Sequence, residues 1–413
     1  MRDRFFDSTG AVCAVAVSTL LLSHASDLLA AAPTQGPAAI DAGPVALTPT
    51  LGTEIKYRDN IYLQESNTVD SWIYLARPTL NALLQDRNNT YQLDYKGEAA
   101  WYEVNSHNDR NDYFDNTFSG DAHLELSDRW IAEGYASWAS LHEDRGTGLS
   151  EGFIGTVLPE PIEFDQSDVG GSLQFGTNES VGRLLLETGY MDRTYTNFKE
   201  LTRPRDRDET TVATTFFFPV APKTDVLAEY TFKNIHYPNR FEEVPMLDSD
   251  EQSLLVGAQW EINPNMTSTA KAGYVEKNFD DSARKDWDGL GWSLEVWMQP
   301  RDQDTILVLS TQHPEETTLQ GNFIKREELS TTWRHEWSDR VYSELSGLIG
   351  QDAYEQSFDG REDDIFKVSL KAGYEFRRWM NVYAGYGYDR RNSNADDLSY
   401  RDYIFNVGVE LSL

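Results

Sequence analysis

Apolar and polar residues alternate along the last part of the chain, residues 362–413. One set of alternate positions is apolar: Phe366, Val368, Leu370, Ala372, Tyr374 and Phe376. The positions between them are polar or small: Lys367, Ser369, Lys371, Gly373 and Glu375. Successive side chains of a β-strand point to opposite faces, so this segment predicts a strand with one apolar and one polar face. Two further segments, 379–390 and 399–413, continue the alternation to the end of the chain.

The same alternation is present from residue 47 onward. It predicts eighteen strands, at residues 47–58, 69–83, 90–104, 113–126, 130–141, 164–176, 182–194, 208–218, 224–235, 250–262, 266–278, 287–299, 304–313, 323–336, 340–352, 363–376, 379–390 and 399–413. Helical periodicity is not sustained anywhere in this region, so no separate helical domain is expected.

The connections between the predicted strands alternate in length. One set consists of short turns, at residues 127–129, 178–180, 221–223, 263–265, 300–302, 338–340 and 377–378. The other set consists of longer polar loops, at residues 105–112, 142–163, 196–207, 237–250, 280–286, 314–322, 353–362 and 391–398. Bacterial transmembrane barrels have short periplasmic turns and long outer loops. With an even number of strands, both termini are then expected in the periplasm.

Alternating strands occur both in soluble β-sandwiches and in transmembrane barrels. The predicted strands run to about ten to fourteen residues, whereas strands of globular proteins usually have five or six. Trp and Tyr residues gather at the ends of the apolar rows, where membrane proteins place their interfacial aromatic belts. The sequence therefore predicts an all-β fold, a transmembrane antiparallel β-barrel of about eighteen strands in the bacterial outer membrane.

Residues 1–32 predict a secretory signal peptide. Arg2 and Arg4 precede the apolar run Ala11–Leu22, and small residues follow at 30–32. A short membrane anchor is the alternative, but the apolar run is shorter than the roughly eighteen residues that a spanning helix needs.

The remaining N-terminal residues, 33–46, are rich in Pro, Gly and Ala and predict a periplasmic linker. The barrel domain is then expected over residues 47–413. The only cysteine, Cys13, lies in the predicted signal peptide, so the mature chain is expected to have neither a disulfide nor a cysteine metal site.

The chain is strongly acidic, with 68 Asp and Glu against 36 Lys and Arg and a net charge of −32. Such a charge disfavours nucleic acid as a partner, because nucleic acid binds to basic surfaces. Since lipid excludes charged side chains, the acids of a barrel must lie in its lumen and loops. An acidic lumen favours cations over anions.

The sequence contains no catalytic or metal-binding motif. Its histidines are not spaced for a metal, and neither G-x-S-x-G nor H-E-x-x-H is present. No enzymatic activity and no cofactor are therefore expected. Acidic clusters at 280–281, 362–364 and 396–397 would suit Ca²⁺ ions, but solvated loop charge is the favoured interpretation.

Two aromatic residues within the polar rows, Trp297 and Tyr383, are candidate sugar contacts in the lumen. Aromatic faces suit sugar rings, and neighbouring acids and amides can bond to sugar hydroxyls. The alternative is that these rings pack only against their neighbours in the wall. The Gly-rich loop 142–163 has two interpretations as well: it folds into the lumen as a constriction, or it caps the mouth.

Several residues of the opening segment, Leu47–Tyr113, form a recognisable set. They are Tyr57, Asp59–Tyr62, Asp70, Ser71, Pro78, Tyr91–Leu93, Tyr95, Gly97, Glu98, Asp112 and Tyr113. In these residues the chain resembles the outer-membrane β-barrel porin family associated with exopolysaccharide export systems. The resemblance implies a large channel for a secreted polysaccharide, which works with a periplasmic polysaccharide export protein. The last residue, Leu413, departs from the aromatic residue that ends many such barrels.

Three functions follow, and export of an exopolysaccharide is the favoured one. The alternatives are a general or substrate-selective diffusion porin and a surface-binding or adhesin barrel that acts through its outer loops. In each case outer-membrane lipid and lipopolysaccharide are expected to surround the barrel.

Overall fold

The computed structural model describes residues 39–104, 110–177, 180–239, 244–317 and 320–412. The predicted signal peptide and residues 33–38 of the predicted linker lie outside these ranges. Within them, nineteen strands form one sheet, and the neighbouring strands are antiparallel.

The strands are β1 Ile40–Ala42, β2 Val45–Arg58, β3 Ser71–Asp86, β4 Asn89–Tyr102, β5 Tyr113–Ser127, β6 Trp130–Glu143, β7 Ile162–Phe175, β8 Arg183–Tyr195, β9 Arg207–Ala221, β10 Thr224–His236, β11 Ser249–Asn263, β12 Met266–Phe279, β13 Trp287–Arg301, β14 Asp304–Glu315, β15 Phe323–Ser338, β16 Val341–Glu355, β17 Glu362–Arg377, β18 Met380–Ser393 and β19 Tyr400–Ser412. The described loops contain short helices: η1 Gly148–Ser150, α2 Phe153–Val157, α3 Lys199–Thr202 and η2 Arg203–Arg205. None of the helices in the described ranges has the length and apolar character needed to cross a membrane.

Strands β2 to β19 close into a barrel. Each pairs with the next along the chain, and β19 pairs back onto β2, where Phe405 lies opposite Tyr57. These eighteen strands, of 12 to 16 residues, lie within three residues of their predicted bounds. The predicted fold class is confirmed. The short strand β1 adds to it, because the end of the predicted linker forms a hairpin in which Ile40 lies opposite Leu47.

The outer face of the barrel is apolar. On β17, Phe366 and Leu370 are exposed, and Val256 on β11 and Leu290 on β13 are 59% and 60% exposed. Alternate residues on neighbouring strands point the same way, so these side chains form a continuous band around a closed wall. A soluble protein would bury such a band, whereas lipid stabilises it.

Exposed aromatic side chains border this band at both ends of the strands. Trp130, Trp337 and Trp379 lie at the end with the short turns, and Trp72, Trp101 and Phe114 lie at the end with the long loops. Transmembrane barrels carry such aromatic girdles at the two membrane–water interfaces, one at each end of the apolar band.

The polar rows face the lumen as predicted. Three of the four cations Arg183, Lys271, Lys367 and Lys371 on these rows have an acidic partner within 4.0 Å. Arg183 Nη2 lies 2.5 Å from Asp225 Oδ2, and Lys271 Nζ lies 2.6 Å from Glu229 Oε2. Lys367 lies 3.9 Å from Asp389. Lys371 differs, because its ammonium lies 4.5 Å from the centre of the Tyr383 ring.

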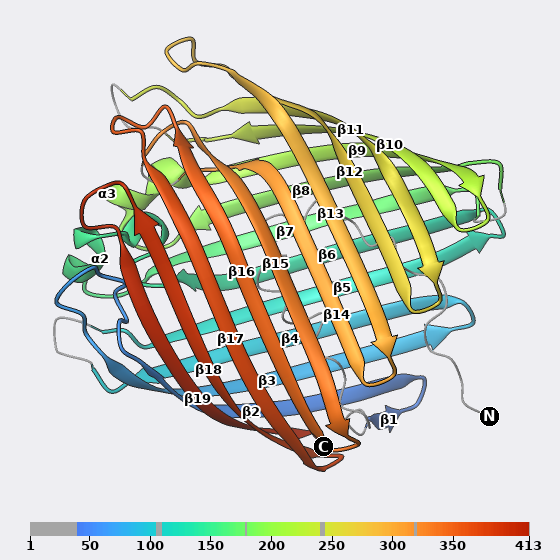
Figure 1. Ribbon diagram of the computed structural model, residues 1–413, viewed down its shortest axis with the longest axis horizontal. Coiled ribbons are helices and arrows are strands. Elements are labelled where there is room, and N and C mark those ends of the chain that lie inside the picture. Colours follow the sequence, from blue (N-terminus) through green and yellow to red (C-terminus); the bar gives the residue numbers. More distant parts are fainter. Residues whose placement is uncertain (1–38, 105–109, 178–179, 240–243, 318–319, 413) are drawn as a thin grey trace.

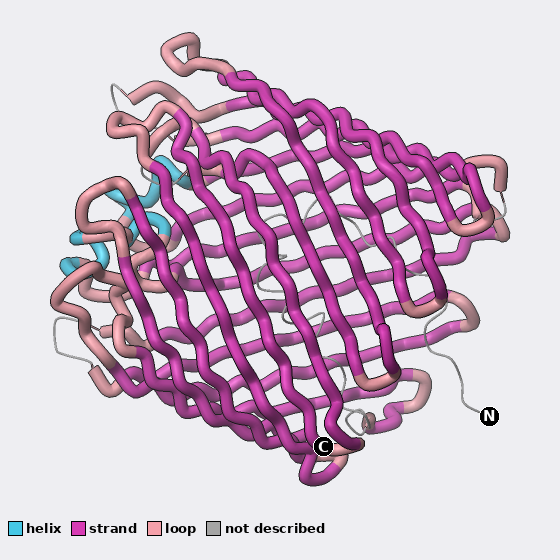
Figure 2. Tube along the Cα trace, in the orientation of Figure 1, coloured by secondary structure: helices cyan, strands magenta, loops and turns pink. Residues whose placement is uncertain are grey.

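The two ends of the barrel differ in structure. Figure 1 shows α2 and α3 at one end, among the long loops, while the C-terminus lies at the opposite end. Figure 2 shows the same contrast, with long coils at the first end and tight turns at the other. These are called the long-loop end and the short-turn end below.

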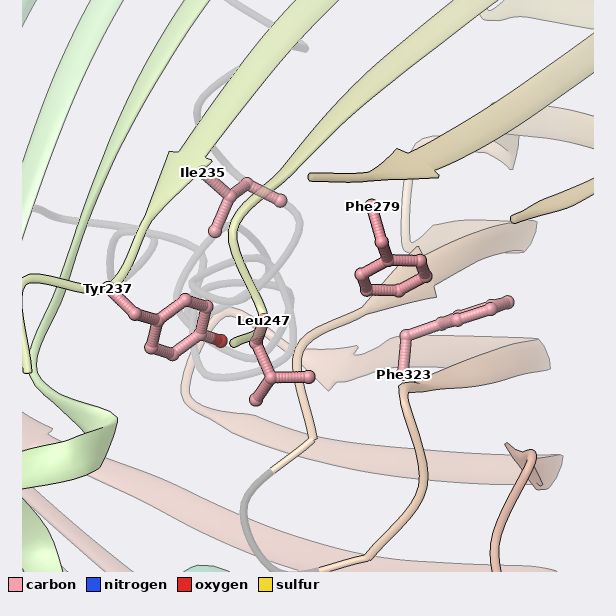
Figure 3. Packing of buried hydrophobic residues seen from close by; sticks show 5 residues of the cluster. All are labelled: Ile235, Tyr237, Leu247, Phe279 and Phe323. Atoms are coloured by element: carbon pink, nitrogen blue, oxygen red, sulfur yellow. The ribbon is translucent and has the colours of Figure 1, made fainter. Parts of the chain in front are cut away.

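At the long-loop end the loops pack on one another and on the strand ends. Ile235, Tyr237, Leu247, Phe279 and Phe323 form one buried cluster there (Figure 3). The hydroxyl of Tyr237 donates a 2.6 Å hydrogen bond to Glu316. Burial and the charge of Glu316 together raise the pKa of Tyr237 far above its ordinary value, so this hydroxyl keeps its proton. The loops at this end are therefore built structures with cores of their own.

Candidate functional site

The β6–β7 loop, residues 144–161, is the longest described connection of the barrel. It is anchored at its base by Leu149, which is fully buried against Ile162, Phe164 and Tyr195. Ile162 and Phe164 belong to β7 and Tyr195 belongs to β8, so the loop packs on the ends of its own and the next strand.

Internal contacts fix the path of this loop. Arg145 donates from Nη1 to the backbone oxygens of Gly155 at 2.9 Å and Leu158 at 2.6 Å. Gly146 has a φ of 78°, in the left-handed region, and lies so close to Tyr62 that a Cβ would overlap its backbone. A glycine is required at this point because only glycine accepts both conditions without strain.

Beyond this base the loop reaches a distant part of the wall. Glu151 accepts hydrogen bonds from Arg361 Nη1 at 2.7 Å, from Arg361 Nη2 at 3.1 Å, and from Arg391 Nη1. Arg361 Nη2 also lies 2.5 Å from Asp363. We call these four residues, Glu151, Arg361, Asp363 and Arg391, the Glu151 latch.

The latch is almost completely removed from solvent. Arg361 and Asp363 are 1% exposed, and Glu151 and Arg391 are 8% and 7% exposed. Two carboxylates balance two guanidinium groups, so the buried cluster carries no net charge. Burial opposes the charged form of Arg361, but its hydrogen bonds to Glu151 and Asp363 outweigh this and raise its pKa above the usual value. The Arg361 guanidinium also lies 4.0 Å from the centre of the Tyr354 ring.

The position of the latch shows how the loop runs. The loop leaves the wall at β6 and returns at β7, whereas Arg361 precedes β17 and Arg391 belongs to β18. These strand pairs are far apart in the sheet order on both sides of the barrel. The β6–β7 loop therefore reaches across the mouth and is fastened to strands that are not its neighbours in the wall. Both interpretations of this loop, a constriction folded into the lumen and a cap over the mouth, stay predictions.

A cavity of about 540 Å³ lies where this loop meets the lumen wall. The loop contributes Asp144 and Thr147, and the wall contributes charged side chains of β2–β4 and β8 together with aromatic ones. The principal charged wall residues are Lys56, Arg58, Arg77, Glu98 and Arg193. We call this space the mouth cavity.

Charge pairing stabilises the wall of the mouth cavity. Arg58 lies 2.7 Å from Asp402, and Arg77 lies 2.5 Å from Glu98 and 3.1 Å from Glu54. Such close charge-assisted pairs hold the side chains in defined positions. The cavity is thus a preformed, polar space rather than an opening between mobile side chains.

The sequence-predicted lumen contacts lie elsewhere. Trp297 is half-buried on the lumen row of β13, opposite Thr267 and Leu307, near the short-turn end. Tyr383 is on β18, also near that end, and its hydroxyl donates a 2.8 Å hydrogen bond to Glu54. The ring of Tyr383 lies over Gly408, where a Cβ would overlap it. The structure does not bring these two residues together, and their role in sugar contact stays a prediction.

One side chain in each of two of the three acidic loop clusters is hydrogen-bonded within the protein. Asp363 is a member of the latch, and Asp281 accepts hydrogen bonds from the backbone nitrogens of Met246 and Ala283. Over the described ranges, no group of three or more His, Cys, Asp or Glu side chains is placed to hold a metal ion.

The family comparison settles the class of protein. A family model described as "Putative beta-barrel porin 2" matches residues 32–413. The chain belongs to this porin family. As a porin with a closed wall and an apolar outer band, it resides in the bacterial outer membrane and is a channel-forming β-barrel.

Solved porin structures are similar to this porin in fold. OpdK (OccK1) of Pseudomonas aeruginosa matches with a TM-score of 0.47 and 12% identity, over 89% of this chain and 99% of that chain. OccAB4 of Acinetobacter baumannii matches at 0.44 and 13%, over 90% and 99%. OprD of Pseudomonas aeruginosa matches at 0.43 and 10%, over 92% and 98%. No sequence among curated proteins matches the chain.

Proposed function

We propose that this porin is the outer-membrane channel of an exopolysaccharide export system, with a mouth that is closed at rest by the Glu151 latch. The latch carries the proposal. A general diffusion porin needs a path that stands open, whereas a buried ion-pair network across the mouth holds a resting state that cargo or a partner can displace. The resemblance of the opening segment to export-associated barrels supplies the cargo class.

The lumen chemistry supports a hydrophilic polymer as cargo. Pairs such as Lys271 with Glu229 and Arg183 with Asp225 neutralise charge along the wall. These paired side chains offer hydrogen bonds to hydroxyl groups and add little local net charge that would hold a polymer in place. In this proposal the short-turn end faces a periplasmic polysaccharide export protein. Trp297 and Tyr383, which lie near that end, contact the sugar as the polymer enters. The porin acts as a channel and not as an enzyme.

Deletion of the gene tests the export proposal. The expected result is loss of polysaccharide from the cell surface while intracellular synthesis continues, because only the last step across the outer membrane is blocked. The measurement compares surface and cell-associated polymer in the deletion strain and in the strain complemented with the intact chain. Unchanged surface polymer in the deletion strain would contradict the proposal.

A substrate-selective diffusion porin is the second candidate, and the mouth cavity favours it. A space of about 540 Å³ suits a small solute. Steady conductance of the purified barrel in planar bilayers, together with intact polymer export after deletion, would favour this function. A barrel that neither conducts nor supports export would instead favour the surface-binding role.

The orientation in the membrane gives a separate prediction. An epitope tag inserted between Phe358 and Asp359 should be reached by antibody on intact cells, because this connection lies at the long-loop end and Phe358 is fully exposed. A tag between Pro264 and Asn265, in a short turn, should be reached only after the outer membrane is permeabilised. Labelling of the Pro264 tag on intact cells would reverse the proposed periplasmic position of the termini.

A further inference from the structure

We infer that the mouth cavity binds a sugar unit that carries a carboxylate. The inference deepens the proposed carbohydrate function and rests on it for the sugar part of the ligand. It depends on which charged groups of the cavity are already satisfied within the wall and which are not.

The carboxylates that line the cavity are matched by donors of the protein. Glu98 accepts from Arg77 at 2.5 Å and from the Tyr113 hydroxyl at 2.6 Å. Glu143 accepts from the Tyr195 hydroxyl at 2.8 Å and from a backbone nitrogen at 3.0 Å. Asp144 lies 3.8 Å from Arg58. These carboxylates already have hydrogen-bond or ion-pair partners within the protein, so they do not favour binding of a cationic ligand.

Two cations of the same cavity are less well matched. Arg193 on β8 donates from Nε and Nη2 to the neutral Gln166 side chain, at 2.9 and 2.6 Å, and no carboxylate of the described residues lies within 4.0 Å of it. Among the described residues, Lys56 on β2 has one ion-pair partner within 4.0 Å, Glu54 at 3.7 Å, and the carboxylates of Glu98 and Asp144 act on it from farther away. Both side chains therefore keep N–H groups that a ligand can use.

The placement of these cations indicates an anionic ligand. Arg193 is held over the Phe164 ring, 4.7 Å from its centre, so its position is fixed before a ligand arrives. A guanidinium in a partly desolvated space forms strong hydrogen bonds with a carboxylate. In a chain with a net charge of −32, a cavity whose cations lack a close carboxylate partner is a local exception.

Aromatic rings in the same cavity suit the remainder of a sugar. Tyr102, Tyr113 and Phe164 line it, and Tyr113 stacks on His142 with ring centres 3.6 Å apart. Apolar ring faces pack against the C–H faces of a sugar, while the cation contacts fix its charged substituent. A small inorganic anion would use the cations alone and would gain nothing from the rings.

Binding to the purified full barrel tests the inference, with galacturonate and galactose as probes and calorimetry at low salt as the measurement. The wild-type barrel should bind galacturonate roughly tenfold or more tightly than galactose, because only the carboxylate accepts charge-assisted hydrogen bonds from Arg193 and Lys56. Arg193→Gln should remove most of that preference, and Arg193→Lys should keep part of it. In 1 M salt the preference should shrink, since the screening length falls to about 3 Å.

Arg183→Gln is the matched control. Arg183 lies in the lumen row of the same strand, β8, but it is paired with Asp225 and does not line the cavity. This variant should bind both probes as the wild type does. Equal binding of galacturonate and galactose by the wild type, or an unchanged preference in Arg193→Gln, would overturn the inference. Acetate bound as tightly as galacturonate would overturn its sugar part.

The outcome is separable from that of the export proposal. If deletion of the gene leaves surface polymer unchanged while Arg193→Gln loses galacturonate binding, the binding site stands and the export role falls. If deletion abolishes surface polymer while Arg193→Gln binds galacturonate normally, the export role stands and the acidic-sugar site falls.

Discussion

Replacement of Glu151 by Gln should release the β6–β7 loop from the far side of the mouth. Within the described ranges, the carboxylate is the part of this loop that bonds to Arg361 and Arg391, and both arginines are nearly inaccessible to solvent. Removing one partner of a buried ion pair typically costs about 3–5 kcal/mol, because the remaining charge stays buried without compensation. This cost applies to the state in which the loop covers the two arginines. Movement of the loop away from them exposes both arginines to water, so the variant favours the open state.

A change of this size should raise the population of the open mouth by roughly a hundredfold or more. Two measurements report it: single-channel conductance in planar bilayers, which should show more frequent large openings, and proteolysis of the loop in the folded barrel, which should become faster. Because the strands are not altered, heat-modifiable mobility on gels should stay as in the wild type.

Glu160→Gln is the control for this experiment. Glu160 lies in the same loop, but its partner Arg110 is 3.7 Å away and both side chains are well exposed. Exposed pairs contribute roughly 0–1 kcal/mol, so conductance and proteolysis should hardly change. Equal behaviour of Glu151→Gln and Glu160→Gln would show that the latch does not hold the mouth closed.

The barrel itself could be predicted from the sequence because its determinants are local. Each strand has one face toward lipid and one toward the lumen, so the alternation of Phe366, Lys367 and Val368 already assigns the two faces. Strand bounds followed from the turn residues between the alternating segments. The pairing of each strand with its neighbour along the chain then leaves little freedom in the topology.

The contact between Glu151 and the arginines across the mouth could not be predicted in the same way. Glu151 and Arg361 are 210 residues apart, and each lies in a polar loop where a solvated charge is the ordinary expectation. Nothing in the local pattern distinguishes a buried carboxylate from an exposed one. The Gly-rich composition of the β6–β7 loop was the one usable signal, and the left-handed backbone at Gly146 explains part of it.

Apolar residues inside the lumen were also missed. Ile73 and Leu75 are buried on the inner face of β3, where they pack with Ala100, and Trp72 and Tyr74 are exposed on the outer face. A segment that is apolar on both faces gives no alternation from which a face can be read. One residue of the set that carries the family resemblance, Asn60, has a structural role. It is buried, and it donates a 2.9 Å hydrogen bond to the Arg401 backbone oxygen, which ties the β2–β3 loop to β19.

Replacement of Val368 by Arg should block assembly of the barrel, whereas Ser369→Arg should be tolerated. Val368 lies on the outer row of β17 with the exposed Phe366 and Leu370, near the middle of the strand. An arginine at the membrane midplane costs roughly 2–4 kcal/mol. Ser369, the next residue, faces the lumen, where Gly387 and Ser346 are its strand neighbours and leave room for a longer side chain.

The two variants differ by one position and introduce the same side chain, so any difference between them reports the face and not the residue. Heat-modifiable mobility on gels and the amount of protein in the outer membrane measure the outcome. Val368→Arg should lose the compact, heat-modifiable form and be degraded, because an unassembled barrel exposes its strand edges to periplasmic proteases. Ser369→Arg should keep the wild-type mobility. The opposite result would mean that the inner and outer rows of β17 are reversed, and with them the lumen assignment of Arg193 and Tyr383, since the same alternation and strand register place all of these side chains.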